Sequence, residues 1–371
     1  MKAVLQICQN YHQPFLDCTR QYAALFRETD FTVVTVFICG EENSQAREEV
    51  GQGEVIFLGH HRDELDGLKM RISREIRNIS KRYDFQACIA HRNKSTYLAL
   101  MATKLPVISI HHAFGDFDRL GRRLMAKIFR NRLTFIGVSN AVRDEIRDRF
   151  PYWTENKIFT LYNRINTSKL RQSLLSQKDA RTKLNLPLDA YIAGNVGRLH
   201  PDKDQKTLIK AFAKAYHALP ENFYLCILGK GKSEHMLRSL ALDLGVADRV
   251  IFTGHVENAK SLFRAFDIFI LSSNHEPFGM VLLEAMVADI AIICSNCGGG
   301  AEVVRGVGDL FEFGDVSQLS ELILKNFRSG KTSPADISHQ QHLMRFSDEN
   351  AQSVFWAQPE IKRLLETESC R

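Results

Sequence analysis

Two glutamates lie eight positions apart in the stretch "SSNHEPFGMVLLEAM", residues 272–286. Glu276 precedes a Pro-Phe-Gly break, and Glu284 falls in an apolar run with the character of a helix. A turn here would expose backbone N–H groups at the helix start. At about 1.5 Å per residue, Glu284 would lie about two turns into the helix and about 12 Å from Glu276. Since carboxylates accept hydrogen bonds from vicinal hydroxyls, the pair is predicted to hold both ends of one long anionic ligand. A solvated glutamate is the alternative for Glu284, but its apolar neighbours disfavour it.

Cations and glycines follow other apolar runs that are predicted to be strands. "AGNVGRLHPDK" contains Gly197, Arg198 and Lys203, and "ILGKGKSE" contains Gly229 and Gly231. "FTGHVEN" and "CSNCGGGAE" end two further runs. Ordinary turn chemistry explains any one of these, but such turns at one edge of a parallel sheet suit a phosphate or diphosphate.

The elements that must position these residues alternate between strand and helix. Buried runs such as "FTVVTVFICG", "FQACIAH" and "PVISIHH" are separated by helical patterns in the first half, and four more runs follow "YIAGNVG" in the second. This alternation predicts two doubly wound parallel α/β domains. Residues 62–83, 118–135 and 259–266 are each predicted to be helical along their length.

A chain of 371 residues is too long for one ordinary core. The predicted domains are residues 1–165 and 166–345, with the boundary between 163 and 190. Residues 346–371 are predicted to be a C-terminal helical segment that packs back toward the first domain.

Composition narrows the class of protein. The content is 44% apolar and 25% charged, no apolar run is long enough to cross a bilayer, and "MKAVLQICQN" does not resemble a secretory signal. We therefore expect a cytoplasmic protein. The chain has eight cysteines, and Cys294 and Cys297 have C-x-x-C spacing. Because no second ligand pair accompanies them, loop cysteines are favoured over a metal or redox site.

The positive charge lies in the first half. Residues 1–165 hold 25 Lys and Arg against 19 Asp and Glu, whereas the remainder holds 24 of each. This favours an anionic partner near the first domain. Nucleic acid is not expected, because aromatic residues do not alternate with the basic ones as stacking would require. The basic, amphipathic stretch 118–135 would either lie on an anionic membrane surface or pack on the sheet with a solvated basic face.

The motifs "NVGRLHPDKDQKTLIKAF", "LGKGKSEHMLRSLALDLGVADRVIFTGHVEN" and "SSNHEPFGMVLLEAM" resemble the signature blocks of the retaining glycosyltransferases of group 1, or family 4. The resemblance is nearly continuous over residues 190–315. The first half matches more weakly, through "PVISIHH" and "FIGVSNAVRDEI". The family resemblance implies the GT-B fold, with two Rossmann-like domains whose parallel sheets face an interdomain cleft.

The resemblance also implies roles for individual residues. Arg198 and Lys203 would bind the donor diphosphate, Glu276 the sugar hydroxyls and Glu284 the ribose. His112, rather than His111, would lie near the reacting carbon, although a core histidine is the alternative for either. The implied donor-binding set further contains Gly197, Gly229, Gly231, Gly254, His255, Val256, Pro277, Phe278 and Gly279. No metal site is implied, and "DFD", residues 116–118, is interpreted as a loop.

Two departures from the family pattern concern the acceptor. "CQNYHQPFLD" replaces a Gly-Gly loop, so Tyr11, His12 and Phe15 would alter the acceptor pocket. The junction "NRIN" carries the additional cation Arg164, which either contacts the acceptor or faces solvent.

We therefore expect a retaining hexosyltransferase that needs no metal cofactor. The donor would be a nucleotide sugar, with a UDP-hexose ahead of GDP-mannose. The acceptor would be a saccharide or a lipid-linked glycan, as in lipopolysaccharide core or bacterial envelope synthesis, and the enzyme could be peripheral to the inner face of the membrane. The alternatives are a nucleotide-sugar epimerase or phosphorylase on the same fold, and a non-catalytic subunit that binds sugar nucleotides.

Overall fold

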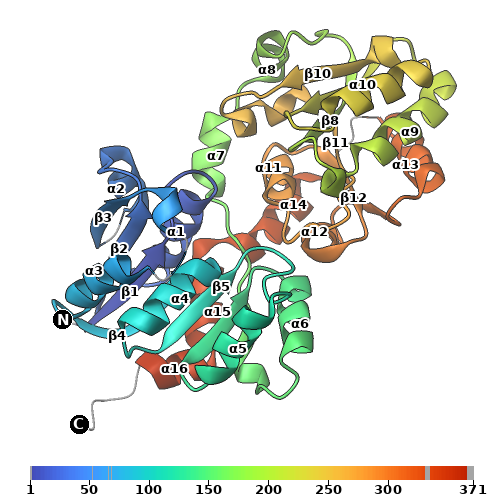
Figure 1. The fold of residues 1–371 in the computed structure, drawn as a ribbon. Coiled ribbons are helices and arrows are strands. Elements are labelled where there is room, and N and C mark those ends of the chain that lie inside the picture. Colours follow the sequence, from blue (N-terminus) through green and yellow to red (C-terminus); the bar gives the residue numbers. More distant parts are fainter. Residues whose placement is uncertain (1, 52, 66, 68, 331–334, 366–371) are drawn as a thin grey trace. The chain divides into compact units, whose positions relative to one another are not determined.

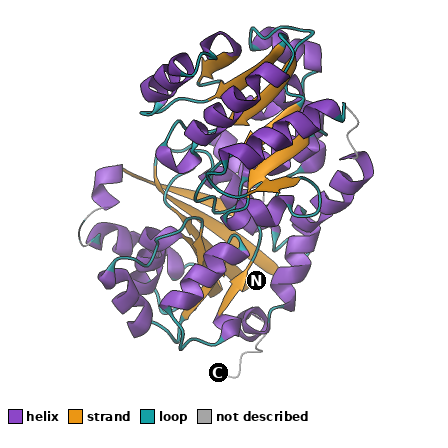
Figure 2. Ribbon diagram, turned by 90° about the vertical axis from the view of Figure 1, so that its right-hand side faces the viewer, coloured by secondary structure: helices purple, strands orange, loops and turns teal. Residues whose placement is uncertain are grey.

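The computed structural model describes residues 2–51, 53–65, 67, 69–330 and 335–365. The chain forms two α/β units (Figure 1). Unit 1 comprises Met1–Arg164 and Asp348–Arg371, and unit 2 comprises Ile165–Ser347. Helices flank the strands of each sheet (Figure 2), which is the layered arrangement expected when parallel strands are buried on both faces.

Unit 1 contains a seven-stranded sheet in the order β3-β2-β1-β4-β5-β6-β7, with every neighbouring pair parallel. The order reverses between β1 and β4, and crevices for ligands form at such reversals beyond the carboxyl ends of the strands. The strands are β1 Lys2–Cys8, β2 Phe31–Cys39, β3 Glu54–His60, β4 Asp84–His91, β5 Val107–His111, β6 Leu133–Gly137 and β7 Ile158–Thr160.

The chain returns to unit 1 through two helices after unit 2. The α15 helix packs against α1, where Trp356 Nε1 donates to the Leu25 carbonyl at 2.8 Å, and α16 contacts β4. The helices of unit 1 are α1 Phe15–Ala24, α2 Ser44–Val50, α3 Met70–Ser80, α4 Arg92–Ala102, α5 Leu120–Ile128, α6 Asn140–Arg149, α15 Asp348–Ala357 and α16 Pro359–Leu365.

Two predicted helices of unit 1 are shorter than expected. Within residues 62–83, the 3₁₀ helix Arg62–Leu65 is separate from α3, and Gly67 and Lys69 both have positive φ, which ends a right-handed helix. Within residues 118–135, α5 covers only Leu120–Ile128, and Leu133 already begins β6.

Unit 2 contains a six-stranded parallel sheet in the order β10-β9-β8-β11-β12-β13, which reverses between β8 and β11. Its strands are β8 Tyr191–Val196, β9 Phe223–Leu228, β10 Val250–Gly254, β11 Ile268–Leu271, β12 Ala291–Ser295 and β13 Asp309–Phe311. The helices are α7 Thr167–Ser173, α8 Gln177–Lys183, α9 Gln205–Ala215, α10 Glu234–Asp243, α11 Met280–Val287, α12 Gly298–Val304, α13 Val316–Arg328 and α14 Ala335–Leu343. The helix expected over 259–266 is the 3₁₀ helix Ala259–Ala265.

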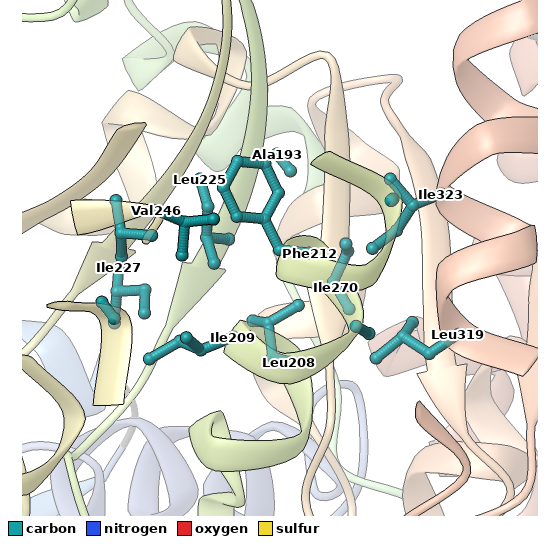
Figure 3. Packing of buried hydrophobic residues seen from close by; sticks show 14 of the residues in the cluster. Ala193, Leu208, Ile209, Phe212, Leu225, Ile227, Val246, Ile270, Leu319 and Ile323 are labelled. Carbon is teal, nitrogen blue, oxygen red and sulfur yellow. The ribbon is translucent and has the colours of Figure 1, made fainter. Parts of the chain in front are cut away.

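The core of unit 2 anchors the strands whose ends carry the candidate site. Phe212 of α9 lies with Leu225 of β9 and Ile270 of β11 in one buried cluster, which also contains Leu319 and Ile323 of α13 (Figure 3). Because these side chains fix both helices and strands, the loops at the carboxyl ends start from rigid positions. Among the described residues, no helix has both the length and the apolar character that crossing a bilayer requires.

Candidate active site

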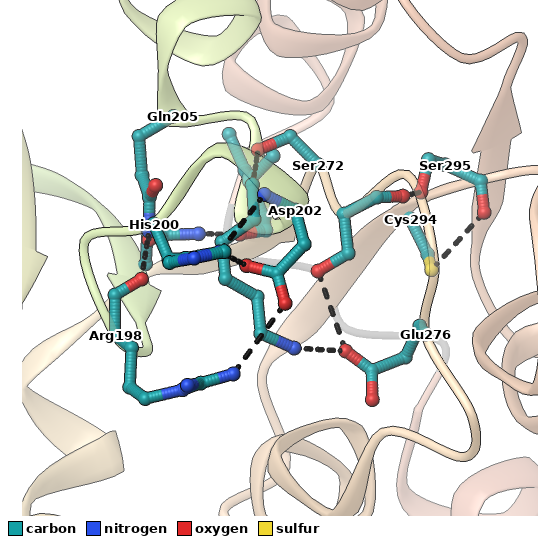
Figure 4. A network of polar contacts seen from close by, with 12 residues as sticks. Arg198, His200, Asp202, Gln205, Ser272, Glu276, Cys294 and Ser295 are labelled. Carbon is teal, nitrogen blue, oxygen red and sulfur yellow. Dashed lines mark hydrogen bonds and ion pairs between the residues drawn. The ribbon is translucent and has the colours of Figure 1, made fainter. Parts of the chain in front are cut away.

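The point where the order of the second sheet reverses brings two distant charged residues together. Lys203 follows β8 in a 3₁₀ turn, Pro201–Lys203, and Glu276 follows β11. Since β8 and β11 are neighbours, Lys203 Nζ reaches Glu276 Oε2 at 2.7 Å (Figure 4). A cation and a carboxylate therefore lie together at the reversal point, which is where open parallel α/β sheets generally bind ligands.

Hydroxyl groups fix this pair in place. Ser273 Oγ donates to Glu276 Oε2 at 3.3 Å, and Ser272 Oγ donates to the Lys203 carbonyl at 3.0 Å. Ser295, at the end of β12, donates to the Ser273 carbonyl at 2.6 Å (Figure 4). The Glu276 side chain is mostly buried, so its position is set by these partners rather than by solvent.

A second cation lies on the same loop. The Arg198 side chain is 72% exposed, and its Nη2 lies 3.4 Å from Asp202 Oδ2. The other Asp202 oxygen lies 2.5 Å from His200 Nδ1 (Figure 4). Asp202 thus joins Arg198 to His200, and neither residue of the His200–Asp202 pair was singled out from the sequence. Their only sequence signal is their position inside the motif that contains Arg198 and Lys203.

Close packing of the loops explains two of the glycines. A Cβ at Gly229 would lie 1.8 Å from the Gly197 carbonyl oxygen, and one at Gly231 would lie 2.3 Å from the Leu199 oxygen. The Gly229 N–H also donates to the Gly254 carbonyl at 2.8 Å, so the loops after β8, β9 and β10 contact one another. A Cβ at Gly197, by contrast, would have only Lys203 Cγ nearby, at 4.0 Å, so Gly197 leaves space beside the lysine.

The loop after β10 supplies the remaining residues predicted at this edge. His255 directly follows Gly254 and is exposed, and Val256 is half-buried. Both therefore lie at the carboxyl edge of the sheet, on the side of β9 away from Glu276.

The turn before α11 begins as predicted but the helix starts later. Gly279 caps α11 with a φ of 91°, and the helix runs from Met280. Glu284 is therefore little more than one turn into α11, not two, and the 12 Å estimate does not apply because Pro277 and Phe278 are not helical. Glu284 is half-buried, and the Phe278 ring packs against Phe346.

The two histidines of unit 1 differ in their surroundings. His111 is fully buried, with Nδ1 2.7 Å from Asp116 and Nε2 3.0 Å from Ser109 Oγ. His112 is half-buried, with Nε2 3.3 Å from His91 Nδ1 and Nδ1 3.8 Å from Cys18 Sγ. His111 has the contacts of a core residue, whereas His112 belongs to a short chain of polar groups at the ends of β4 and β5.

The side chains of His91, His112 and Cys18 are all neutral at neutral pH. Burial lowers the pKa of His91 to about 3 and lowers the pKa of His112 well below its usual value, and the neighbouring His91 and Arg92 lower the latter further. Burial raises the pKa of the Cys18 thiol. His112 is therefore a neutral hydrogen-bonding group rather than a cation.

Arg164 does not face solvent, so that alternative is wrong. Its side chain is buried and Nε lies 3.1 Å from Asp348 Oδ1, while its backbone N–H donates to Gln21 at 2.8 Å. Arg164 and Asp348 are the residues at which the chain leaves and re-enters unit 1. The ion pair therefore joins the two segments of that unit.

The loop 116–118 has structural partners. Asp116 contacts His111, and Asp118 Oδ1 lies 2.6 Å from Arg149. Within the described residues there is no cluster of three or more His, Cys, Asp or Glu side chains arranged to hold a metal ion. Cys294 is buried and Cys297 is partly buried, and both are free thiols.

The sequence of each half matches a family model. Residues 176–340 match the model of "Glycosyl transferases group 1", and residues 21–169 match that of "Glycosyltransferase Family 4". The chain belongs to the group 1, family 4 glycosyltransferases. The family resemblance that the sequence motifs indicated is thereby confirmed.

Relatives in this family share about a third of their residues with the chain over the matched stretch. The "Lipopolysaccharide core biosynthesis glycosyltransferase LpsE" of Rhizobium meliloti is 33% identical over 175 residues, which cover 46% of this chain and 49% of the relative. The "D-inositol 3-phosphate glycosyltransferase" of Acidothermus cellulolyticus is 33% identical over 136 residues, covering 34% and 30%. The chain thus spans about half, or less, of the length of these relatives.

Solved glycosyltransferase structures have the same fold. A glycosyltransferase from Rickettsia africae superimposes with a TM-score of 0.83 at 17% identity, covering 99% of each chain. Anabaena HepE, solved in complex with UDP and glucose, superimposes with a TM-score of 0.75 at 19% identity, covering 98% of this chain and 99% of HepE. The predicted GT-B fold with two parallel α/β sheets is confirmed.

Proposed function

We propose that this family 4 glycosyltransferase moves a hexose, with retention of the anomeric configuration, from a nucleoside-diphosphate sugar to a saccharide or lipid-linked acceptor. The observation that carries this proposal is the Lys203–Glu276 pair at 2.7 Å, with Arg198 exposed on the same loop. Positive charge for a diphosphate and a carboxylate for hydroxyls stand together at one sheet edge.

Lys203 can serve the diphosphate and Glu276 at once. An ammonium group has three N–H donors, and only one is needed for Glu276 Oε2. The others can donate to phosphate oxygens as the sugar–phosphate bond breaks and negative charge develops on the leaving group. Arg198 supplies a second cation, and its exposure leaves its guanidinium accessible to the ligand.

Glu276 has an oxygen to offer the sugar. Oε2 takes the bonds from Lys203 and Ser273, whereas Oε1 forms no hydrogen bond with the described residues. Oε1 would accept from sugar hydroxyls, helped by the backbone amides of Phe278 and Gly279 at the start of α11. Glu284, further along α11, would bind the ribose diol.

The reaction places positive charge on the anomeric carbon and negative charge on the departing diphosphate. We assign no covalent nucleophile and favour attack from the face that the nucleotide leaves. His112 would act near the reacting carbon as a neutral partner for sugar hydroxyls, because a cation there would oppose the charge of the transition state.

Features of the relatives and of the charge distribution support particular substrates. HepE was solved with UDP and glucose, which favours a UDP-hexose donor here. LpsE is named for lipopolysaccharide core biosynthesis, and the excess of cations in residues 1–165 suits an anionic, lipid-linked glycan as the acceptor.

The test begins with thermal shifts of the purified chain in UDP-, GDP- and dTDP-sugars. We expect the greatest stabilisation from a UDP-sugar and its loss in Lys203→Met, while Lys183→Met, at an exposed position of α8, keeps it. Nucleotide release that requires an acceptor would support transfer. No shift with any donor would contradict the site, and equal release without acceptor would contradict transfer.

A further inference from the structure

Three large aliphatic side chains form an exposed stripe on α5. Leu120 is 75% exposed, Leu124 60% and Ile128 67%. They are spaced by four residues, so they lie on one face of the helix (α5 in Figure 1). Ala126 is the only residue of α5 that is fully buried. Leu120, Leu124 and Ile128 therefore do not anchor the helix to unit 1.

Exposed cations surround this stripe. Arg119, Lys127 and Arg130 are exposed, and none of them forms an ion pair with another described residue. Two other basic side chains of the segment have partners in unit 1: Arg122 donates to the Asp116 carbonyl at 2.9 Å, and Arg132 donates to the Thr103 carbonyl at 2.7 Å. Arg123 is half-buried. Arg119, Lys127 and Arg130 are thus available to bind a partner.

The loop after α6 contacts the segments that flank α5 on both sides. Arg149 is paired with Asp118 at 2.6 Å, and Lys157 Nζ donates to the Arg130 carbonyl at 2.9 Å, so residues 149–157 border both ends of α5. Tyr152 in this loop is 97% exposed. Tyrosine is a side chain that is enriched at the boundary between lipid and water.

We propose that the α5 face, defined as Leu120, Leu124 and Ile128 with Arg119, Lys127 and Arg130, binds the surface of a bilayer that contains anionic phospholipids. A helix of nine residues is about 13 Å long, too short to cross a bilayer but suited to lie flat in its interfacial region. The aliphatic side chains enter the acyl boundary, and the cations contact phosphate headgroups.

The charge of the face selects this partner over a second copy of the chain. A symmetric contact would bring identical patches together and oppose cations to cations without a carboxylate to compensate them. Asp118, the acidic residue closest to the face in sequence, is already paired with Arg149.

The test is co-sedimentation of the full chain with phosphatidylcholine vesicles, with and without phosphatidylglycerol, in the absence of donor and acceptor. We expect binding only when phosphatidylglycerol is present, and weaker binding as salt rises. Leu124→Ser with Ile128→Ser should lower the partition coefficient about tenfold or more. Leu242→Ser is the matched control, because this leucine is 70% exposed on α10 of unit 2 and should leave binding unchanged.

A second variant tests the electrostatic part. Lys127→Glu with Arg130→Glu should abolish the preference for phosphatidylglycerol, and circular dichroism should show that each variant is folded. The proposal is overturned if the wild-type chain does not sediment with anionic vesicles, or if both double variants bind as it does. A dimer in size-exclusion chromatography that Leu124→Ser removes would also overturn it, in favour of self-association. No outcome depends on the donor site, so failure here leaves the proposed reaction unaffected.

Discussion

The Lys203–Glu276 pair predicts that Glu276→Gln destabilises the wild-type protein but stabilises the Lys203→Met variant. Lys203 is 19% and Glu276 10% exposed at their side chains, and the charged atoms are 2.7 Å apart. Lys203→Met leaves a mostly buried carboxylate, for which Ser273 is the remaining hydrogen-bond donor among the residues that the structure describes. Removal of one partner from a buried pair costs about 3–5 kcal/mol, and the partial exposure here reduces this to about 2–3 kcal/mol.

Glu276→Gln is expected to have a smaller effect on its own. The amide keeps an oxygen for Lys203 and Ser273, so the loss is about 1 kcal/mol. In the Lys203→Met background, however, Glu276→Gln removes the uncompensated charge and should stabilise the protein. The interaction free energy between the two substitutions should therefore exceed the cost of Glu276→Gln alone and is expected to be about 2 kcal/mol, with the double variant more stable than Lys203→Met alone.

Urea unfolding followed by far-ultraviolet circular dichroism measures these free energies. The two tryptophans, Trp153 and Trp356, both belong to unit 1, so fluorescence reports that unit while the substitutions lie in unit 2. Lys325→Met is the control, because Lys325 is 65% exposed in its pair with Asp309 and should cost less than about 1 kcal/mol. If the two effects simply add, or if Glu276→Gln destabilises the Lys203→Met variant, the assignment of Lys203 as the cation that compensates Glu276 is wrong.

Three further predictions concern other parts of the chain. Arg198→Ala should lower kcat/KM for transfer about 10²–10³-fold without changing the urea midpoint, because its side chain is mostly exposed; wild-type kinetics would refute its contact with the diphosphate. Unfolded His91 binds a proton below pH about 6.5, whereas folded His91 does so only near pH 3. The stability of unit 1 should therefore fall as pH drops through this range, by up to about 1.4 kcal/mol per pH unit, and tryptophan fluorescence should show a shallower pH dependence for His91→Phe. Asp348→Ala should destabilise unit 1 by about 3 kcal/mol or more, since Arg164 stays buried without its carboxylate; an unchanged fluorescence midpoint would contradict this.

Local pattern was sufficient where an element is long and well buried. The strands that became β2, β4, β8 and β9 were predicted from their apolar runs, and the turn at Pro277 and Gly279 from its residue types. By contrast β3, β7 and β13 were not predicted. Each lies at the edge of its sheet, and β7 and β13 have only three residues, so their sequences carry little periodicity.

Long-range packing decided what the pattern left open. The choice between His111 and His112 depends on which ring reaches Asp116, and the burial of Arg164 depends on Asp348, which is 184 positions away. The residues next to His111 and Arg164 in the sequence do not specify either of these contacts. The length of α5 was overestimated for the same reason, because an amphipathic pattern continues into the buried strand β6.

By itself the sequence determined that Arg198, Lys203 and Glu276 follow parallel strands, and hence that they lie at one edge of a sheet. That inference needs only the period of the strands and the common direction of parallel neighbours. The contact between Lys203 and Glu276 was decided by tertiary structure alone, because it depends on β8 having β9 as its neighbour on one side and β11 on the other. Strand order results from the packing of the whole unit, and no local stretch of sequence specifies it.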